Sequence, residues 1–133
     1  MSEPIKELTK AEDQVMQILW KLKNAFVKDI VELFNDPKPA YNTVSTIIRI
    51  LEKKGFVSYK SYGNTYEYYP LITKSEYSDA YLGNFVNKYF GNSYKSLVSF
   101  FAANDNVSVN ELEEMKVFLD QEIQKKQING NNH

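Results

Sequence analysis

A stripe of hydrogen-bonding side chains recurs at helical spacing near the middle of this 133-residue chain. Its members are Asn42, Ser45, Thr46 and Arg49. Asn can pair bidentately with adenine and Arg with guanine, while Ser and Thr hydroxyls serve bases or phosphates. The stripe therefore has the chemistry needed to read base edges in double-stranded DNA. An ordinary solvated helix face would carry the same residue types, so the interpretation depends on the elements around the stripe.

Basic residues gather beside this stripe. Residues 38–60 hold five Lys or Arg and one acidic residue, although the whole chain has a net charge of -1. A DNA-facing surface needs such local positive charge. Lys53, Lys54 and Lys60 are expected to grip phosphates and so position the helix without reading sequence. The further candidates for backbone contacts are Tyr41, Tyr62 and Asn64.

The chain lacks the residue types that catalytic and metal sites commonly use. The chain has no cysteine, and its one histidine is His133 at the end of a polar tail. Thiolate nucleophiles, disulfides, histidine-based triads and conventional zinc sites are therefore not expected. We expect no catalytic residue, no metal and no cofactor, and a protein that is not an enzyme. Without a secretory signal or an apolar run of roughly 20 residues, it is expected to be cytoplasmic and not inserted in a membrane.

Three helices are predicted in the first half of the chain. Thr9 and Glu12 form a capping-box pattern that predicts a helix from there to about Lys23, with Trp20 in or near the core. A shorter helix is predicted over about 27–35, without an obvious N-cap. The third helix is predicted over 41–54, because apolar residues follow a helical period and Gly55 supplies a C-terminal stop.

A β-hairpin is predicted directly after the third helix. The runs 56–61 and 65–69 are rich in β-prone residues and flank Tyr62-Gly63-Asn64, and Pro70 closes the second run. Tyr66 and Tyr68 are expected to pack against the helices. Three helices followed by a two-stranded ribbon is the order of elements in a winged helix-turn-helix, whose third helix enters the major groove.

The C-terminal part is predicted to be helical and to form a dimer. Capping-box patterns at 73–76 and 108–111 predict two helices, with a short helix over about 94–101 between them. These helices are too few and too aromatic-rich to bury their apolar faces alone, so we expect a second copy to cover them. Folding back onto the first domain as a monomer is the alternative. The residues expected in the dimer contact are Tyr77, Tyr81, Phe85, Leu97, Phe101, Leu112, Met115 and Leu119.

The predicted fold class is mainly α with a small β-hairpin wing. The expected organisation is a winged helix-turn-helix DNA-binding domain over 1–72, a helical dimerisation segment over 73–127 and a flexible tail over 128–133.

Several strings resemble the BlaI/MecI/CopY penicillinase-repressor family of winged-helix transcriptional regulators. They are Leu8-Thr9-Lys10-Ala11-Glu12, Val15-Met16-Gln17-Ile18-Leu19-Trp20, Thr43-Val44-Ser45-Thr46-Ile47-Ile48-Arg49, Lys53-Lys54-Gly55-Phe56 and Tyr68-Tyr69-Pro70-Leu71. Phe90-Gly91, Ser96-Leu97-Val98 and Glu111-Leu112-Glu113-Glu114 sit where the dimerisation segment of such repressors has similar residues. The resemblance extends from about residue 7 to 125, and the order and spacing of the strings make it specific.

The resemblance implies a homodimeric repressor that binds a dyad-symmetric DNA operator. Its two recognition helices would enter successive major grooves and block transcription. In the β-lactam-responsive branch, a membrane sensor metalloprotease triggers cleavage in the dimerisation segment, which releases the DNA. The aligned place in this chain is Phe100-Phe101.

The chain departs from the family pattern at functional positions. Familiar members carry an Asn-Phe bond where this chain has Phe100-Phe101. They also tend to carry a basic residue where Ser45 stands and an arginine where Ile50 stands. The operator sequence therefore does not transfer. The copper-responsive branch needs a cysteine-rich tail, which this chain lacks.

Two other functions stay open on the sequence. One is a winged-helix protein-interaction module that does not bind DNA. It has no need of the positive charge in residues 38–60. The other is a repressor that senses a small molecule between Tyr77, Tyr81 and Phe85, although core packing also explains those aromatic residues.

Overall fold

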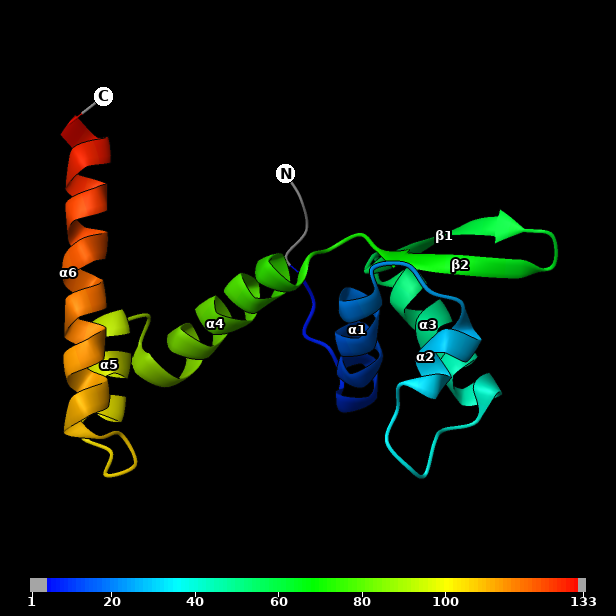
Figure 1. Ribbon diagram of the computed structural model, residues 1–133, viewed down its shortest axis with the longest axis horizontal. Coiled ribbons are helices and arrows are strands. Elements are labelled where there is room, and N and C mark those ends of the chain that lie inside the picture. Colours follow the sequence, from blue (N-terminus) through cyan, green and yellow to red (C-terminus); the bar gives the residue numbers. More distant parts are fainter. Residues whose placement is uncertain (1–4, 132–133) are drawn as a thin grey trace. The chain divides into compact units, whose positions relative to one another are not determined.

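A computed structural model describes residues 5–131 of the chain (Figure 1). The chain divides into two compact units, residues 1–84 and 85–133. The division falls inside helix α4 (Lys74–Phe90), whereas the sequence predicted a boundary between residues 72 and 73. The first half of α4 therefore belongs to the N-terminal unit.

Helix α1 (Lys10–Leu22) begins at the predicted capping box. The Thr9 hydroxyl accepts from the Glu12 N–H at 3.2 Å, and the Glu12 carboxylate accepts from the Thr9 N–H at 3.0 Å. These two bonds satisfy backbone donors that a helix start leaves free. At the other end, the Lys23 N–H donates to the Leu19 carbonyl at 2.7 Å.

Helix α2 (Val27–Glu32) has a cap that sequence analysis missed and ends earlier than predicted. The Asp29 carboxylate accepts from the Phe26 N–H at 3.1 Å, which holds the first turn. After Glu32, Leu33 and Phe34 donate to carbonyls only three residues back, so the last turn tightens before the proline-containing loop.

Helix α3 (Tyr41–Lys53) ends in a Schellman motif. The Phe56 N–H donates to the Leu51 carbonyl at 2.9 Å, and the Gly55 N–H to the Glu52 carbonyl at 3.0 Å. Gly55 has a φ of 84°, a conformation that glycine adopts without the steric cost of a Cβ atom. The predicted stop at Gly55 is confirmed.

The hairpin has a tighter turn than predicted. Strands β1 (Val57–Tyr62) and β2 (Thr65–Pro70) pair antiparallel, with Tyr62 opposite Thr65 and Val57 opposite Pro70. Only Gly63 and Asn64 form the turn, and Gly63 has a φ of 61°. A positive φ at the first turn position suits the twist of a two-residue hairpin.

An isolated β-bridge adds one further residue to the edge of this sheet. Ala25, in the loop between α1 and α2, exchanges two hydrogen bonds with Tyr68 on β2, at 2.9 and 2.8 Å. This bridge attaches the hairpin to the helices, and sequence analysis did not find it.

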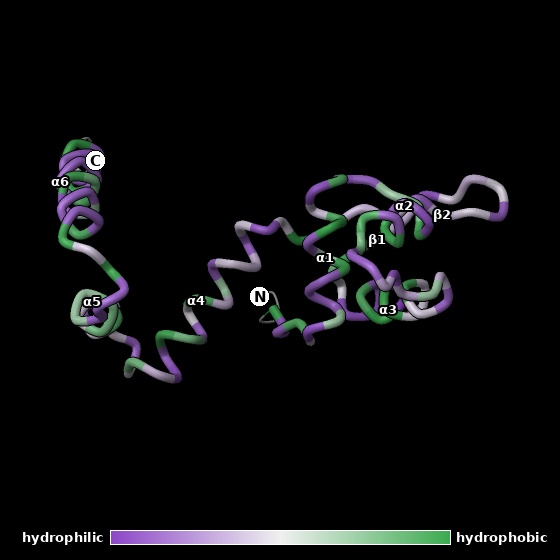
Figure 2. Tube along the Cα trace, turned by 60° about the horizontal axis from the view of Figure 1, so that its bottom comes forward, coloured by the Kyte–Doolittle hydropathy of each residue, from purple (hydrophilic) through white to green (hydrophobic). Residues whose placement is uncertain are grey.

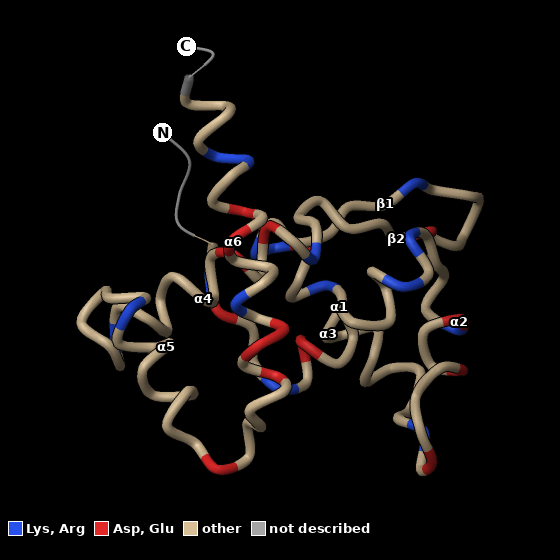
Figure 3. The backbone as a smooth tube through the Cα atoms, turned by 60° about the vertical axis from the view of Figure 1, so that its left-hand side comes forward, with Lys and Arg blue, Asp and Glu red and all other residues tan. Residues whose placement is uncertain are grey.

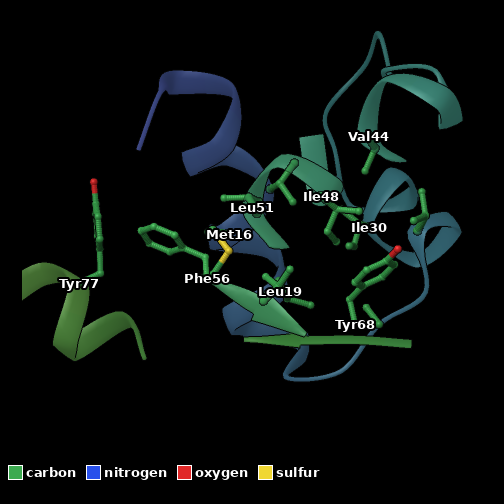
Figure 4. Close-up of a cluster of buried hydrophobic side chains, with 13 residues drawn as sticks. Met16, Leu19, Ile30, Val44, Ile48, Leu51, Phe56, Tyr68 and Tyr77 are labelled. Carbon is green, nitrogen blue, oxygen red and sulfur yellow. The ribbon is translucent and has the colours of Figure 1, made fainter. Parts of the chain in front are cut away.

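The core of the N-terminal unit lies between α1, α2, α3 and the hairpin (Figure 4). Figure 4 shows side chains from all of these elements meeting, with Phe56 beside Tyr77 of α4. The most deeply buried members are Val15, Met16, Leu19, Ile30, Val44, Ile48 and Leu51. Trp20 packs against this core as predicted and donates from Nε1 to the Ile72 carbonyl at 2.8 Å.

The C-terminal unit contains the end of α4, helix α5 (Tyr94–Ala102) and helix α6 (Val109–Asn131). The two predicted capping boxes are both present, one at 73–76 before the first half of α4 and one at 108–111 before α6. Helix α6 continues through Asn131, so the tail expected from residue 128 is helical as far as the structure describes it, and His133 lies outside the described residues. Hydrophobic positions recur along α5 and α6 (Figure 2). No helix within residues 5–131 has the length and apolar character needed to cross a membrane.

Candidate nucleic-acid interface

Helix α3 presents the predicted polar stripe on its outer side. Val44, Ile48 and Leu51 are fully buried on one side, which fixes the rotation of the helix about its axis. On the other side, Asn42, Thr46 and Arg49 are exposed and Ser45 is half-buried. All four candidate base-reading residues thus lie on the accessible face.

The hydroxyl of Thr46 is already partly used. It donates to the Asn42 carbonyl at 2.9 Å, one turn back in the same helix. Its proton is therefore directed at the backbone, and the oxygen lone pairs and the methyl group are left for an outside partner. A thymine methyl or a base amino group fits this arrangement better than a base acceptor does.

A groove of about 380 Å³ separates α3 from the hairpin and the start of α2. Two of the residues that line it, Lys28 and Arg49, are basic, and none is acidic. Its walls therefore favour a negatively charged ligand. The lining residues are Phe26, Val27, Lys28, Tyr41, Asn42, Ser45, Arg49, Asn64, Thr65, Tyr66 and Tyr68.

The groove brings together only part of the predicted set. Asn42, Ser45 and Arg49 from α3 meet Asn64 from the hairpin turn, and Tyr41 lines the groove with more than half of its surface exposed. Lys60 does not line the groove; it follows Tyr59 along β1 and stands opposite Glu67 in the strand register. Figure 3 shows where the basic and acidic residues lie along the backbone, including a basic position on β1. Tyr62 is exposed near the turn, with its ring 6.1 Å from that of Phe26.

Tyr66 and Tyr68 line the hairpin side of this groove, and Tyr59 packs against both of them. The ring centroids of Tyr59 and Tyr66 are 4.5 Å apart, and those of Tyr59 and Tyr68 are 5.7 Å apart. Tyr68 is buried as predicted, and its burial raises the pKa of its phenol. The expectation that Tyr66 packs against the helices is wrong, because its side chain is 43% exposed on the hairpin.

Lys54 is engaged inside the protein. Its Nζ atom lies 2.8 Å from both carboxylate oxygens of Glu12, which is 5% exposed. Burial raises the pKa of Glu12, but the hydrogen bonds from Lys54 and Thr9 and the charge of Lys54 together outweigh burial and lower it. Lys54 therefore ties the end of α3 to the start of α1, in place of the phosphate contact expected from the sequence. Its neighbour Lys53 is exposed.

Lys28 is the functional candidate that sequence analysis missed. It lies in the first turn of α2 and is exposed at the rim of the groove. Nothing in the local sequence marks it, because its closeness to Arg49 arises from the packing of α2 against α3.

The expected dimer residues divide between the two units. Tyr77 is 9% exposed within the N-terminal core, where its ring lies 5.9 Å from those of Phe56 and Trp20. Its assignment to a dimer surface is therefore wrong. Tyr81 is exposed in the same unit. In the C-terminal unit, Met115 and Leu119 are exposed, while Phe85, Leu97, Phe101 and Leu112 are half-buried.

The Phe100-Phe101 bond lies inside helix α5. Phe100 is 63% exposed and its ring is 5.5 Å from that of Phe90, while Phe101 is half-buried. A protease acting on this bond needs the helix to open, because cleavage of structured segments proceeds through transiently opened states.

Three helices, a hairpin facing the third of them and a basic groove between the two define a DNA-binding protein of the winged helix-turn-helix class. The chain matches the protein family described as Penicillinase repressor over residues 8–121. It therefore belongs to the penicillinase repressor family of DNA-binding transcriptional repressors. This family is not enzymatic.

Named relatives agree with this assignment. The chain is 33% identical to the methicillin resistance regulatory protein MecI of Staphylococcus aureus (strain N315) over 114 residues, which covers 85% of this chain and 93% of MecI. It is 32% identical to the penicillinase repressor of Staphylococcus aureus over 121 residues, covering 90% and 95% of the two chains. Among solved structures, the DNA-binding domain of the repressor BlaI matches with a TM-score of 0.49 and 28% identity, covering 58% of this chain and 94% of that one.

Proposed function

We propose that this protein represses transcription in the cytoplasm as a homodimer bound to a dyad-symmetric operator. The observation that supports it best is the groove between α3 and the hairpin, whose lining contains Lys28 and Arg49 and no acidic residue. Asn42, Ser45, Thr46 and Arg49 read base edges from the exposed face of α3. Lys28 and Lys53, with Tyr41, Lys60, Tyr62 and Asn64, hold the sugar-phosphate backbone.

Dimerisation is proposed for the C-terminal unit because a single chain leaves that unit without a core. Val86 is its only fully buried apolar side chain among the described residues. Phe118, Leu119 and Ile123 on α6 are each more than half exposed. Exposed apolar surface on this scale is stabilised by association. Two recognition helices held in this way would meet half-sites about 34 Å apart, or at a multiple of that distance.

The DNA assignment is tested by comparing a sequence-reading residue with phosphate-binding ones. Duplexes are first selected from a random pool, and affinity for the selected and random DNA is then measured over a range of salt concentrations. We expect Arg49→Ala to weaken the selected duplex by roughly 1–3 kcal/mol, with much less effect on random DNA. Lys28→Ala and Lys53→Ala should weaken both duplexes and reduce the salt slope by about one each.

Lys21→Ala is the matched control, because Lys21 is exposed at the end of α1 and does not line the groove. It should change neither affinity. An equal loss on both duplexes for Arg49→Ala would remove the base-reading role of Arg49. Failure of the pool to yield any preferred sequence would refute the whole proposal.

For release from DNA, we propose cleavage of the Phe100-Phe101 bond by a system that includes a membrane sensor metalloprotease. Opening of α5 sets the rate of this step, and Ser93 caps that helix by accepting from the Ser96 N–H at 3.1 Å. Ser93→Ala should weaken the cap by about 1 kcal/mol and speed cleavage several-fold. Intact-mass measurement after induction in a host that carries the sensor checks this. Fragments ending elsewhere than Phe100 would contradict it.

A further inference from the structure

A second hollow, of about 370 Å³, lies within the N-terminal unit and away from the DNA-facing groove. It is bounded by the segment before α1, by one side of α1 and by the start of α4. In Figure 1 the segment before α1 passes beside the start of α4 and then continues into α1. The lining residues are Glu7, Leu8, Thr9, Lys10, Asp13, Gln17, Trp20, Tyr77, Ser78 and Tyr81. Cavities of this size accept small organic ligands.

Three aromatic rings stand in a row along this hollow. The ring of Trp20 lies 5.9 Å from that of Tyr77, and Tyr77 lies 6.2 Å from Tyr81. Two hydrogen bonds hold the first two rings in place. Trp20 Nε1 donates to the Ile72 carbonyl at 2.8 Å, and the Tyr77 hydroxyl accepts from the Leu8 N–H at 2.9 Å. Contacts within the folded protein therefore hold the rings of Trp20 and Tyr77 in fixed positions beside the hollow.

The charged groups around these rings are two carboxylates, Glu7 and Asp13, and one ammonium, Lys10. Neither carboxylate forms an ion pair within the described residues, and Asp13 accepts only a long hydrogen bond, 3.4 Å, from the Gln17 amide. Burial raises the pKa of the Tyr77 phenol, and the charges of Glu7 and Asp13 add to that rise. The charged groups that line the hollow, two carboxylates and one ammonium, therefore sum to -1.

We propose that this hollow binds a small organic ammonium cation. The accessible parts of the Trp20 and Tyr81 rings attract the cation through their quadrupoles, while the buried Tyr77 ring packs against both, and tryptophan provides the strongest attraction of this kind. Glu7 and Asp13 supply the compensating charge, while the apolar body of the ligand displaces water from the rings. The site is separate from the DNA-binding groove and does not depend on the proposed repressor function.

The fluorescence of Trp20 gives a direct test, because Trp20 is the only tryptophan in the chain. Benzyltrimethylammonium is titrated into the full chain at constant ionic strength, and benzoate and benzyl alcohol serve as anionic and neutral comparisons. We expect a saturable change in emission with the cation and none with the other two. The cation should also raise the Tm.

Variants of the charged residues that line the hollow test whether electrostatic attraction contributes to cation binding. Replacing both Glu7→Gln and Asp13→Asn should weaken binding roughly tenfold, and Tyr81→Leu should weaken it several-fold. Lys10→Gln should instead tighten binding, because it removes the opposing charge. This gain is a result that damage to the fold cannot produce. Glu113→Gln, on exposed α6, is the control and should leave binding unchanged.

A response that rises linearly without saturation, or that benzoate or benzyl alcohol reproduces, would overturn the proposal. So would unchanged affinity in the Glu7, Asp13 and Lys10 variants. Because no DNA takes part in this experiment, its failure would leave the repressor assignment untouched.

Discussion

Glu12 joins two distant parts of the chain through one carboxylate. It accepts from the Thr9 N–H at the start of α1 and binds Lys54 Nζ at the end of α3. A buried carboxylate is costly unless it is paired and hydrogen-bonded. The pair therefore matters to stability chiefly because removing one partner leaves the other uncompensated.

We predict that Lys54→Met destabilises the protein by about 1–3 kcal/mol, because it leaves the Glu12 charge buried without its cation. Urea unfolding followed by Trp20 fluorescence measures this. Lys53→Met is the matched control, since Lys53 is exposed and should change stability by no more than about 0.5 kcal/mol. Equal losses in the two variants would contradict the assignment of Lys54.

The same pair gives a signature in pH. The folded pKa of Glu12 is lowered from its ordinary value of 4.5, so its contribution is present above that pH and is lost as pH falls through the lower folded pKa. As the pH is lowered from 5, the free energy of unfolding of the wild type should therefore fall more than that of Lys54→Met. Parallel curves would show that the pair does not stabilise the ionised form.

At the scale of elements, the ends of helices are decided by local chemistry. Capping boxes at Thr9, Thr73 and Ser108 and the glycine stop at Gly55 were predicted from sequence and are present. Each involves residues no more than five positions apart, so the sequence alone contains the information. The Ala25–Tyr68 bridge and the closeness of Lys28 to Arg49 join distant segments, and no local pattern reveals them.

The requirement for glycine at Gly55 can be tested by comparing its substitution with that of Gly83, which lies within a helix. Neither Gly55 nor Gly83 has an atom within 4 Å of the place where a Cβ would be added, so neither substitution causes a clash. Gly55→Ala should destabilise by about 1–2 kcal/mol because of its φ of 84°. Gly83→Ala, within α4, should stabilise by about 0.5–1 kcal/mol. Thermal unfolding measures both, and a change of the same sign in the two variants would contradict the argument.

At the scale of the whole molecule, α4 belongs to both compact units. Tyr77, Tyr81 and Phe85 follow one another at four-residue steps on one face of the helix, and all three were expected in one dimer contact. The structure divides that face, because Tyr77 packs into the N-terminal core while Phe85 and Tyr89 stack on each other at 5.2 Å in the next unit. Periodicity shows that a face is apolar and does not say what covers it.

The two parts of this face should respond differently to mutation. Leu119→Asp places a charge on exposed α6 and should convert dimer to monomer at micromolar concentration without unfolding residues 5–84. Tyr77→Leu should lower the stability of the N-terminal unit and leave the dimer mass unchanged. Sedimentation and Trp20 fluorescence separate these outcomes. A wild-type protein that sediments only as a monomer would contradict the proposed assembly.

The scarcity of buried side chains after residue 84 has a consequence for gene dosage. Among the described residues of that unit, Val86 alone is fully buried. Under the proposed pairing, the amount of competent regulator in the dilute regime rises with the square of the number of copies in a cell. Halving the concentration of the chain at fixed cell volume would therefore leave only about a quarter of the active complexes, so a drop in synthesis would act as a sharp release of the regulated genes.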